Sequence, residues 1–301
     1  MTTLAIHTEK LTKRFHGHAA VDSLDLTVPE GSIYGFIGPN GSGKSTTMKL
    51  LLGLFQATAG EAFVLGERVT TKPNKTLMRQ VGSLIENPSG YGHLTGAENM
   101  KVMQRTLGLT DTQVARALDT VHLTKHQDKL VKHYSLGMKQ RLGIAMALAR
   151  EPRLLILDEP TNGLDPSGID EIRSLLLQLA ADGVTIFVSS HLLDEIDKMV
   201  DLLGIIVRGK LIFQGTRAEL LGRSMPNVLV QASDPAAVLA MAPQATQLPN
   251  GTISVPGLNQ QAASTFLSYL VHHNVDVYEF SRANQSLEDV FLDLTAEGGL
   301  R

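Results

Sequence analysis

The sequence predicts an α/β fold built on a parallel sheet, followed by a small α+β domain. From residue 1 to about 220, short apolar segments alternate with helix-like segments, which is typical of parallel strands covered by helices. After about Leu221 the pattern changes to closely spaced strands and helices, interrupted at Pro226. We therefore expect two domains, covering residues 1–221 and 222–301.

Short apolar segments predict the strands of the first domain. Leu24, Leu26 and Val28 alternate with polar residues, as expected for one half-buried strand. Three further segments are short, apolar and rich in strand-forming residues, as in a buried parallel sheet: Ile33–Ile37, Arg153–Leu157 and Val184–Ser189. Helices are predicted over Thr46–Leu54, which has Gly53 near its end, and over Leu142–Arg150, which Pro152 separates from the next strand.

The second domain is predicted to contain three strands and two helices. The strands cover Asn227–Ala232, Thr252–Val255 and Val275–Phe280, and the helices cover Leu258–His272 and Ser286–Glu297. Ser286 is a suitable N-cap for the last helix, and Leu287, Val290, Phe291 and Leu294 share one of its faces. These segments indicate a compact α+β domain.

The composition excludes several classes of protein. Of the 301 residues, 43% are hydrophobic, and 27 basic against 30 acidic residues give a net charge of −3. This balance disfavours general nucleic-acid binding, which requires a basic surface. No cysteine is present, so disulfides and thiolate chemistry are excluded. Because we find no signal-peptide core and no apolar run near the ~20 residues of a membrane span, we expect a cytoplasmic protein that needs another chain to act on a membrane.

A glycine-rich segment after Ile33–Ile37 matches the pattern G-x-x-x-x-G-K-[ST]. With the threonine that follows, its residues are Gly38, Pro39, Asn40, Gly41, Ser42, Gly43, Lys44, Ser45 and Thr46. Glycines let backbone N–H groups surround a phosphate, and a helix N-terminus favours an anion. Lys44 supplies a cation for the β- and γ-phosphates, and the Ser45 hydroxyl can bind Mg²⁺. The motif predicts a nucleoside triphosphate site, and the alternative is a glycine-rich turn capped by a lysine.

Two carboxylates follow another predicted strand. Leu154–Leu157 is apolar, and Asp158 and Glu159 come directly after it. In phosphoryl transfer, one acid at such a strand end holds Mg²⁺ through water, and the next can accept a proton from the attacking water. Acidic residues are also common where any strand meets a loop. Beside the phosphate-binding motif, we interpret Asp158 as a metal ligand and Glu159 as the base.

Further motifs make the sequence similar to the nucleotide-binding subunits of ABC transporters. Tyr134–Arg141 reads YSLGMKQR and resembles the family signature loop, usually LSGGQ followed by QQR. Gly163–Asp165 resembles the D-loop, and Ser190-His191 resembles the switch histidine that follows a strand. Phe15 lies where the family has an aromatic residue that stacks on adenine. With the two elements above, these motifs occur in the family order and spacing.

The resemblance implies a P-loop NTPase of ABC type, with a RecA-like core, a β-subdomain and a helical subdomain at roughly 88–150. It implies that Phe15 and residues 38–46 hold ATP. It implies that Ser45 and Asp158 bind Mg²⁺. Hydrolysis would be carried out by Glu159, His191 and Lys44. The signature loop comprises Ser135, Leu136, Gly137 and Met138, and its Ser135 and Gly137 would contact the γ-phosphate bound by a second copy of the chain. Asp165 would belong to the D-loop. One copy of each motif cannot close such a composite site, so we expect an ATP-bridged dimer.

The sequence departs from the family pattern in two places. Leu136 replaces the usual first glycine of the signature and Met138 the usual glutamine, a form that resembles subfamilies paired with separately encoded small export permeases. Glu86 replaces the usual glutamine at the hinge between ATP and the permease, where we expect its charge near Mg²⁺ and the attacking water. Its tract, IENPSGYGHLTGAEN, resembles that of lantibiotic-immunity and bacitracin-resistance ATPases. We assign Glu86 to the coupling loop and the Mg²⁺ site, and the alternative is a harmless substitution on a solvated loop.

Simpler interpretations remain open for other positions. Phe15 is alternatively a core residue, and His191 is alternatively a surface histidine at a strand end. Ser135 and Gly137 are alternatively a helix cap, because serine is common in that place.

Together these patterns predict the Mg²⁺-dependent, ATP-hydrolysing subunit of a bacterial ABC exporter, peripheral to the cytoplasmic face of the cell membrane. Its partners would be a second copy of itself and separately encoded permeases, without nucleic acid. The expected cargo is a membrane-active peptide antibiotic such as a lantibiotic or bacitracin. The alternatives are an exporter of a lipid, polysaccharide or small drug, and a soluble ABC ATPase acting on ribosomes or DNA. A regulator that binds ATP without turnover conflicts with the intact Glu159.

Overall fold

The computed structural model describes residues 3–72, 74–86, 90–192, 197, 199–222, 226–283 and 290–291. The chain forms two compact units, one mainly within residues 1–217 and the other within residues 218–293. The boundary falls within a few residues of Leu221, where the sequence pattern changes. Each unit has its own sheet and its own buried core.

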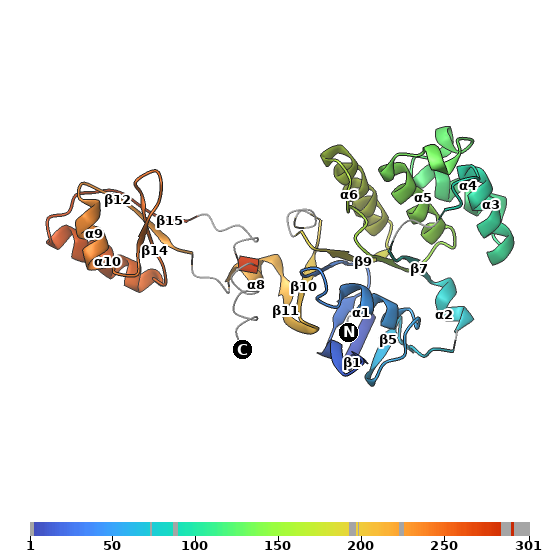
Figure 1. The fold of residues 1–301 in the computed structure, drawn as a ribbon, viewed down its shortest axis with the longest axis horizontal. Coiled ribbons are helices and arrows are strands. Elements are labelled where there is room, and N and C mark those ends of the chain that lie inside the picture. The colour runs from blue at the N-terminus through green and yellow to red at the C-terminus, as the bar shows by residue number, and fades with distance from the viewer. Residues whose placement is uncertain are drawn as a thin grey trace. The chain divides into compact units, whose positions relative to one another are not determined.

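The main sheet of the first unit has six strands in the order β11-β10-β4-β9-β8-β7. In that order they are Lys210–Thr216, Leu202–Val207, Ile33–Ile37, Thr185–Ser190, Leu154–Leu157 and Val81–Leu84. All neighbours are parallel except β11 and β10, which form an antiparallel pair (Figure 1). Strands β4, β8 and β9 are buried along their whole length, which explains the apolar stretches Ile33–Ile37, Leu154–Leu157 and Ile186–Val188. The three predicted buried strands are therefore confirmed to within a residue at each end.

A second, antiparallel sheet forms the β-subdomain of this unit. Its strands are β1 (Leu4–Phe15), β2 (His18–Leu24), β3 (Thr27–Pro29), β5 (Ala59–Val64) and β6 (Glu67–Arg68). The two sheets share a core, since Ile6 and Val28 belong to the same buried cluster as Phe36 and Ile156.

The continuous strand predicted over Leu24, Leu26 and Val28 is wrong. All three side chains are buried, but β2 ends at Leu24 and β3 begins at Thr27. At the break the Thr8 hydroxyl donates to the Leu24 carbonyl at 2.7 Å and accepts from the Leu26 amide at 2.8 Å. A side chain therefore replaces the strand ladder there. Alternating polarity identifies the buried side chains and does not reveal this interruption.

The helices of the first unit fall into two groups. Helix α1 (Lys44–Leu51) follows β4, and α6 (Pro166–Ala181) follows β8. The helical subdomain is formed by α3 (Gly96–Leu107), α4 (Asp111–Thr120) and α5 (Leu136–Leu148), which pack on one another (Figure 1). Short turns η1 (Thr124–His126) and η2 (Val131–His133) connect α4 to α5, and α2 (Lys75–Arg79) precedes β7.

Two helices begin earlier than predicted. Helix α1 starts at Lys44 rather than Thr46, because Gly43 adopts a left-handed conformation (φ 111°) as its N-cap. Helix α5 starts at Leu136 rather than Leu142, with Ser135 as its N-cap. From Leu142 onward α5 is buried on nearly every side, so its sequence lacks the one-sided periodicity that marks a surface helix.

The second unit has the order β-α-β-β-α-β. Its elements are β12 (Val228–Ala232), α9 (Pro235–Met241), β13 (Thr246–Gln247), β14 (Ile253–Val255), α10 (Gln260–His272) and β15 (Val277–Arg282), and α8 (Arg217–Gly222) precedes them. The sheet is antiparallel in the order β13-β14-β12-β15, which is the ferredoxin-like arrangement. Val230, Ile253 and Leu270 lie in its core.

The sequence analysis missed two elements of this unit, the helix α9 and the two-residue strand β13. Asp234 caps α9 by accepting from the Ala237 amide at 3.0 Å, and Pro235 occupies its first turn. Most of the helix predicted at Ser286–Glu297 lies outside the described residues, which include only Val290 and Phe291 of it; both are helical and buried. Throughout the described part of the chain, no helix combines the length and apolar character needed to cross a membrane.

Candidate nucleotide site

The glycine-rich loop lies between β4 and α1, and its glycines are required by its geometry. Gly41 and Gly43 have φ values of 77° and 111°, which favour glycine. A Cβ on Gly38 would lie 2.2 Å from the Ile206 carbonyl oxygen, and one on Gly43 would lie 2.4 Å from that of Ala20. The loop is therefore pressed against β10 and β2 and cannot accept larger residues at these points.

The loop also carries a polar group that lacks a partner. The Ser42 side chain is buried, and its hydroxyl makes no hydrogen bond within the described part of the chain. Such an atom costs free energy unless a ligand or water satisfies it. Together with the backbone amides at the start of α1, this hydroxyl fits an oxygen-rich anion such as a phosphate. Pro39 and Asn40 form the exposed rim of the same loop.

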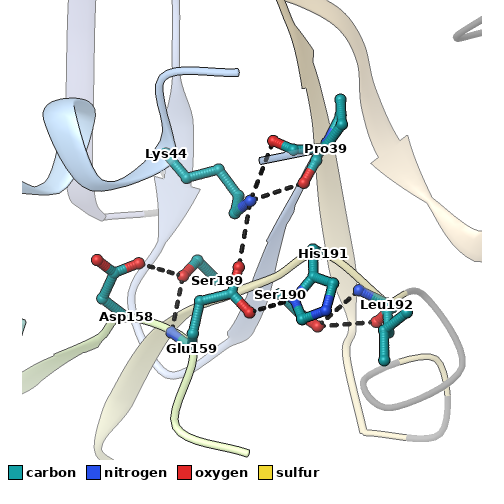
Figure 2. Close-up of polar contacts among 9 residues, drawn as sticks. Pro39, Lys44, Asp158, Glu159, Ser189, Ser190, His191 and Leu192 are labelled. Carbon is teal, nitrogen blue, oxygen red and sulfur yellow. Dashed lines mark hydrogen bonds and ion pairs between the residues drawn. The ribbon is translucent and has the colours of Figure 1, made fainter. Parts of the chain in front are cut away.

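Lys44 joins this loop to the end of β8. Its side chain is buried, and its ammonium donates to the carbonyls of Gly38 at 2.6 Å and Pro39 at 3.3 Å. The same nitrogen lies 3.2 Å from a carboxylate oxygen of Glu159 (Figure 2). The cation and the carboxylate therefore neutralise each other next to the loop.

The other oxygen of Glu159 contacts His191, which follows β9. The Nδ1 of His191 lies 2.6 Å from Glu159 Oε2 (Figure 2). A carboxylate only accepts hydrogen bonds, so this nitrogen carries a proton and donates. Lys44, Glu159 and His191 thus form one connected group at the carboxyl edge of the parallel sheet, where α/β proteins bind ligands.

Asp158 and Glu159 are also linked through a residue that the sequence did not indicate. The buried Ser189 hydroxyl donates to Asp158 Oδ1 at 2.7 Å and accepts from the Glu159 amide at 3.0 Å (Figure 2). Its only sequence signal is its place in Ser189-Ser190-His191, next to the predicted histidine.

The predicted metal ligands differ in how well they fit a cation. Asp158 is buried and accepts no side-chain hydrogen bond from the described residues besides that of Ser189, so its second oxygen is free for a hard cation. Ser45 lies in the first turn of α1, beside Lys44. These two side chains fit a Mg²⁺ site.

Glu86 lies at the same edge, because Leu84 pairs with Leu157 and its carbonyl accepts from the Asp158 amide at 2.8 Å. Its exposed carboxylate, however, forms an ion pair with Lys49 of α1. Residues 87–89 of its tract lie outside the described residues.

Phe15, the predicted adenine-stacking residue, is not in the core. Its side chain is 38% exposed, and its ring meets the edge of Phe55 at 5.5 Å between centroids. The Lys13 ammonium lies 5.0 Å from the Phe15 ring centroid. An exposed ring at the end of β1 is available to stack on a planar ligand.

The signature loop begins α5 and contacts the D-loop. Ser135 caps the helix, since its hydroxyl accepts from the Met138 amide at 3.2 Å. The exposed Leu136 side chain reaches Gly163, and Asp165 caps α6 through the Gly168 amide at 2.9 Å. Gly137 lies in the first turn of α5.

Tyr134, which precedes the loop, donates to the His126 carbonyl at 2.8 Å, and burial raises its pKa, with the Asp128 charge adding to the effect. Within the described part of the chain, no hydrogen bond or ion pair joins the signature loop to Lys44, Asp158 or Glu159.

The strand–loop–helix and the carboxylates after β8 define a P-loop nucleotide-binding protein of the ATPase class. The family model described as "ABC transporter" matches residues 21–162. A model described as "AAA domain, putative AbiEii toxin, Type IV TA system" matches residues 130–197.

Two relatives match along nearly the full length of the chain, and a third matches about two thirds of it. The bacitracin transport ATP-binding protein BcrA of Bacillus licheniformis is 40% identical over 99% of both chains. The daunorubicin/doxorubicin resistance ATP-binding protein DrrA of Streptomyces peucetius is 36% identical over 97% of this chain and 93% of its own. The lantibiotic transport ATP-binding protein SrtF of Streptococcus pyogenes is 41% identical over 68% of this chain and 88% of its own.

The fold has a solved counterpart in cbiO1 of Clostridium perfringens, part of the ABC transporter complex cbiONQ. Its TM-score is 0.68 at 26% identity, covering 73% of this chain and 91% of that one. The chain belongs to the ABC transporter family, as an ATP-binding subunit.

Proposed function

We propose that this chain hydrolyses ATP, with Mg²⁺, to drive a bacterial exporter that removes a membrane-active peptide antibiotic of the bacitracin or lantibiotic type. The observation that carries the hydrolytic part is the grouping of Lys44, Glu159 and His191 beside the buried Asp158. The cargo is supported by the functions named for BcrA and SrtF and by the tract around Glu86.

Each residue of the group has a distinct role in the proposed reaction. Residues 38–46 surround the phosphates of ATP, and Phe15 stacks on adenine. Ser45 and Asp158 hold Mg²⁺, which when bound neutralises charge on the phosphates. Lys44 moves from Glu159 to the phosphates, and the released carboxylate accepts a proton from the attacking water. His191 orients that carboxylate and then contacts the γ-phosphate.

The site is completed by a second copy of the chain. Within the described residues, the signature loop makes no hydrogen bond or ion pair to Lys44 or Glu159. In a head-to-tail dimer, Ser135 and Gly137 of one copy reach the γ-phosphate held by the other. ATP then favours the closed dimer, because only that state satisfies both sides of the phosphate.

The permease docks in a groove between β7, α3 and α5. The groove has a volume of about 740 Å³, and apolar side chains dominate its lining, including Leu84, Val102 and Met146. Tyr91 and Val102 at the groove are 58% and 38% exposed. Glu86 lies two residues after the end of β7, so a short cytoplasmic helix of a permease seated here would lie next to the strand end that leads to ATP. This contact would hold the subunit at the cytoplasmic face of the membrane.

A pull-down and a survival assay test this function. The tagged Glu159→Gln variant is expressed with its native membranes, trapped with Mg²⁺–ATP, solubilised gently and analysed for bound proteins. Recovery of small polytopic membrane proteins supports the transporter subunit. Recovery of ribosomes or DNA without membrane proteins contradicts it. Tyr91→Asp should abolish permease recovery. Tyr278→Asp, which changes a more exposed tyrosine of the second unit, should not.

Cells lacking the subunit and its permeases are then complemented and challenged with bacitracin, a lantibiotic and daunorubicin. Protection by the parent but not by Glu159→Gln against the peptides alone supports the proposed cargo. Protection against daunorubicin alone favours a small-drug exporter, which the match to DrrA makes the second candidate.

A further inference from the structure

Ser189 forms hydrogen bonds to both acidic residues of the site, Asp158 and Glu159. Its side chain is fully buried at 0% exposure, one residue before the end of β9. The Asp158 carboxylate can only accept, so the hydroxyl proton points to it, and a lone pair of the hydroxyl takes the Glu159 N–H. Each of these two hydrogen bonds therefore joins one donor to one acceptor.

The bond to the Glu159 amide lies at a strained point of the backbone. Glu159 has φ 49°, in the left-handed region that residues with a Cβ rarely adopt. The conformation turns the chain immediately after Asp158 and aims the Glu159 side chain at Lys44 and His191. Such a conformation persists only where surrounding contacts hold it.

We propose that Ser189 is a positioning residue for hydrolysis, which holds the Asp158 carboxylate and the Glu159 backbone in one arrangement. The inference rests on the proposed roles of Asp158 as Mg²⁺ ligand and Glu159 as base. Ser189 keeps one Asp158 oxygen occupied, and the other oxygen would be available to hold the cation. It also ties the metal ligand to the base, so that neither moves without the other.

Ser189→Ala removes both hydrogen bonds. We expect the Glu159 amide to exchange its hydrogen with solvent about tenfold faster or more, because its buried acceptor is lost. Hydrogen-exchange mass spectrometry with residue-level fragmentation measures this in the full chain without nucleotide.

The second readout is equilibrium binding of ATP, titrated in Mg²⁺ and in EDTA. We expect the gain in affinity that Mg²⁺ confers to fall about tenfold in Ser189→Ala, because Asp158 loses the bond that orients it. Affinity in EDTA should stay unchanged, since the glycine-rich loop is untouched. Equal losses in Mg²⁺ and EDTA would mean that Ser189 only packs the strand end, and would overturn the proposal.

Three variants keep the test specific. Ser189→Thr retains the hydroxyl and should restore both readouts, whereas Ser189→Cys retains the volume with much weaker hydrogen bonding and should resemble alanine. Ser32→Ala removes another buried hydroxyl, which donates to the Pro29 carbonyl at 2.8 Å before β4, and should change neither readout. If Ser189→Ala does not fold, the threonine and cysteine variants give the same comparison.

A double variant links Ser189 to Asp158. In an Asp158→Asn background, adding Ser189→Ala should leave the remaining Mg²⁺ response unchanged, since the carboxylate that Ser189 orients is absent; fully additive losses would contradict the proposal. If the ATP affinity of the parent protein is the same with and without Mg²⁺, the proposed function itself is refuted. Unchanged exchange of the Glu159 amide in Ser189→Ala would refute the role of Ser189 whatever the activity.

Discussion

Lys44 Nζ lies 3.2 Å from Glu159 Oε1, so the lysine of the glycine-rich loop and the proposed base form an ion pair (Figure 2). His191 holds the other Glu159 oxygen at 2.6 Å. In the proposed mechanism, a phosphate in the glycine-rich loop would compete for Lys44 and free one oxygen of Glu159. The pair would then connect binding of the nucleotide to the availability of the base.

Lys44→Ala should lower ATP affinity by about 10–100-fold, because charge-assisted bonds to the phosphates are lost. Titration with a fluorescent ATP analogue measures the affinity. The exposed Lys125 of η1 provides the control, and Lys125→Ala should bind as the parent does. Retention of parental affinity in Lys44→Ala would exclude its role at the phosphates.

Glu159→Gln should keep ATP binding and ATP-dependent dimerisation while hydrolysis falls by about 10²–10⁴-fold, the usual contribution of a general base. Phosphate release measures turnover, and size-exclusion chromatography with ATP measures the dimer. Glu67→Gln on the exposed β6 should leave both unchanged. Turnover of Glu159→Gln at the parent rate would show that another group accepts the proton.

Gly38→Ala should lower stability and abolish ATP binding, because the added methyl group would lie 2.2 Å from the Ile206 carbonyl oxygen and displace the loop. Thermal unfolding and ATP titration test the two effects. Gly222→Ala at the end of α8 meets open space and should change neither. An unaltered Gly38→Ala protein would contradict the close packing of the loop against β10.

Ser135→Asp separates the capping role of this residue from its proposed contact with the partner's nucleotide. Aspartate is as good an N-cap as serine, so the stability of α5 should persist, but its charge should repel the γ-phosphate and prevent ATP-dependent dimerisation. Ser135→Ala should cost about 1 kcal/mol of stability through loss of the cap. Analytical ultracentrifugation in the Glu159→Gln background measures the dimer. If Ser135→Asp dimerises normally, Ser135 acts only as the N-cap of α5 and does not contact the partner's nucleotide.

Glu86→Gln should keep substantial hydrolysis in the isolated subunit and weaken protection in cells, because the Lys49 pair is lost next to the permease groove. Lys49→Met should weaken protection in the same way, and the double variant should protect cells as well as either single variant does. Dose–survival curves give the comparison. Full protection by Glu86→Gln would make this residue a harmless substitution, and additive defects would show that Lys49 and Glu86 act separately.

The elements that the sequence predicted best are those whose signal is local. The glycines of residues 38–43 are required because the backbone there has positive φ values or lies close to the carbonyl oxygens of neighbouring strands. Asp158 follows strand β8, which is apolar because both of its faces are buried. One boundary that failed depends on a contact distant in sequence. Thr8 interrupts the strand predicted through Leu26. The first turn of α5 was missed because its residues 136–139 are not buried and form no apolar face; the Ser135 cap fixes where the helix begins.

The sequence by itself determined the predicted class of chemistry, since the motifs that contain Lys44, Ser45, Asp158 and Glu159 indicate a phosphate site, metal ligands and a base. The resemblance to the ABC family added His191. Only the tertiary structure decided how these groups pair. It joined Lys44 to Glu159, put Ser189 between the two acids, and joined Glu86 to Lys49. The physical reason is that residue types specify what a group can donate, accept or coordinate, whereas its partner depends on which strand ends the parallel sheet brings to the same edge.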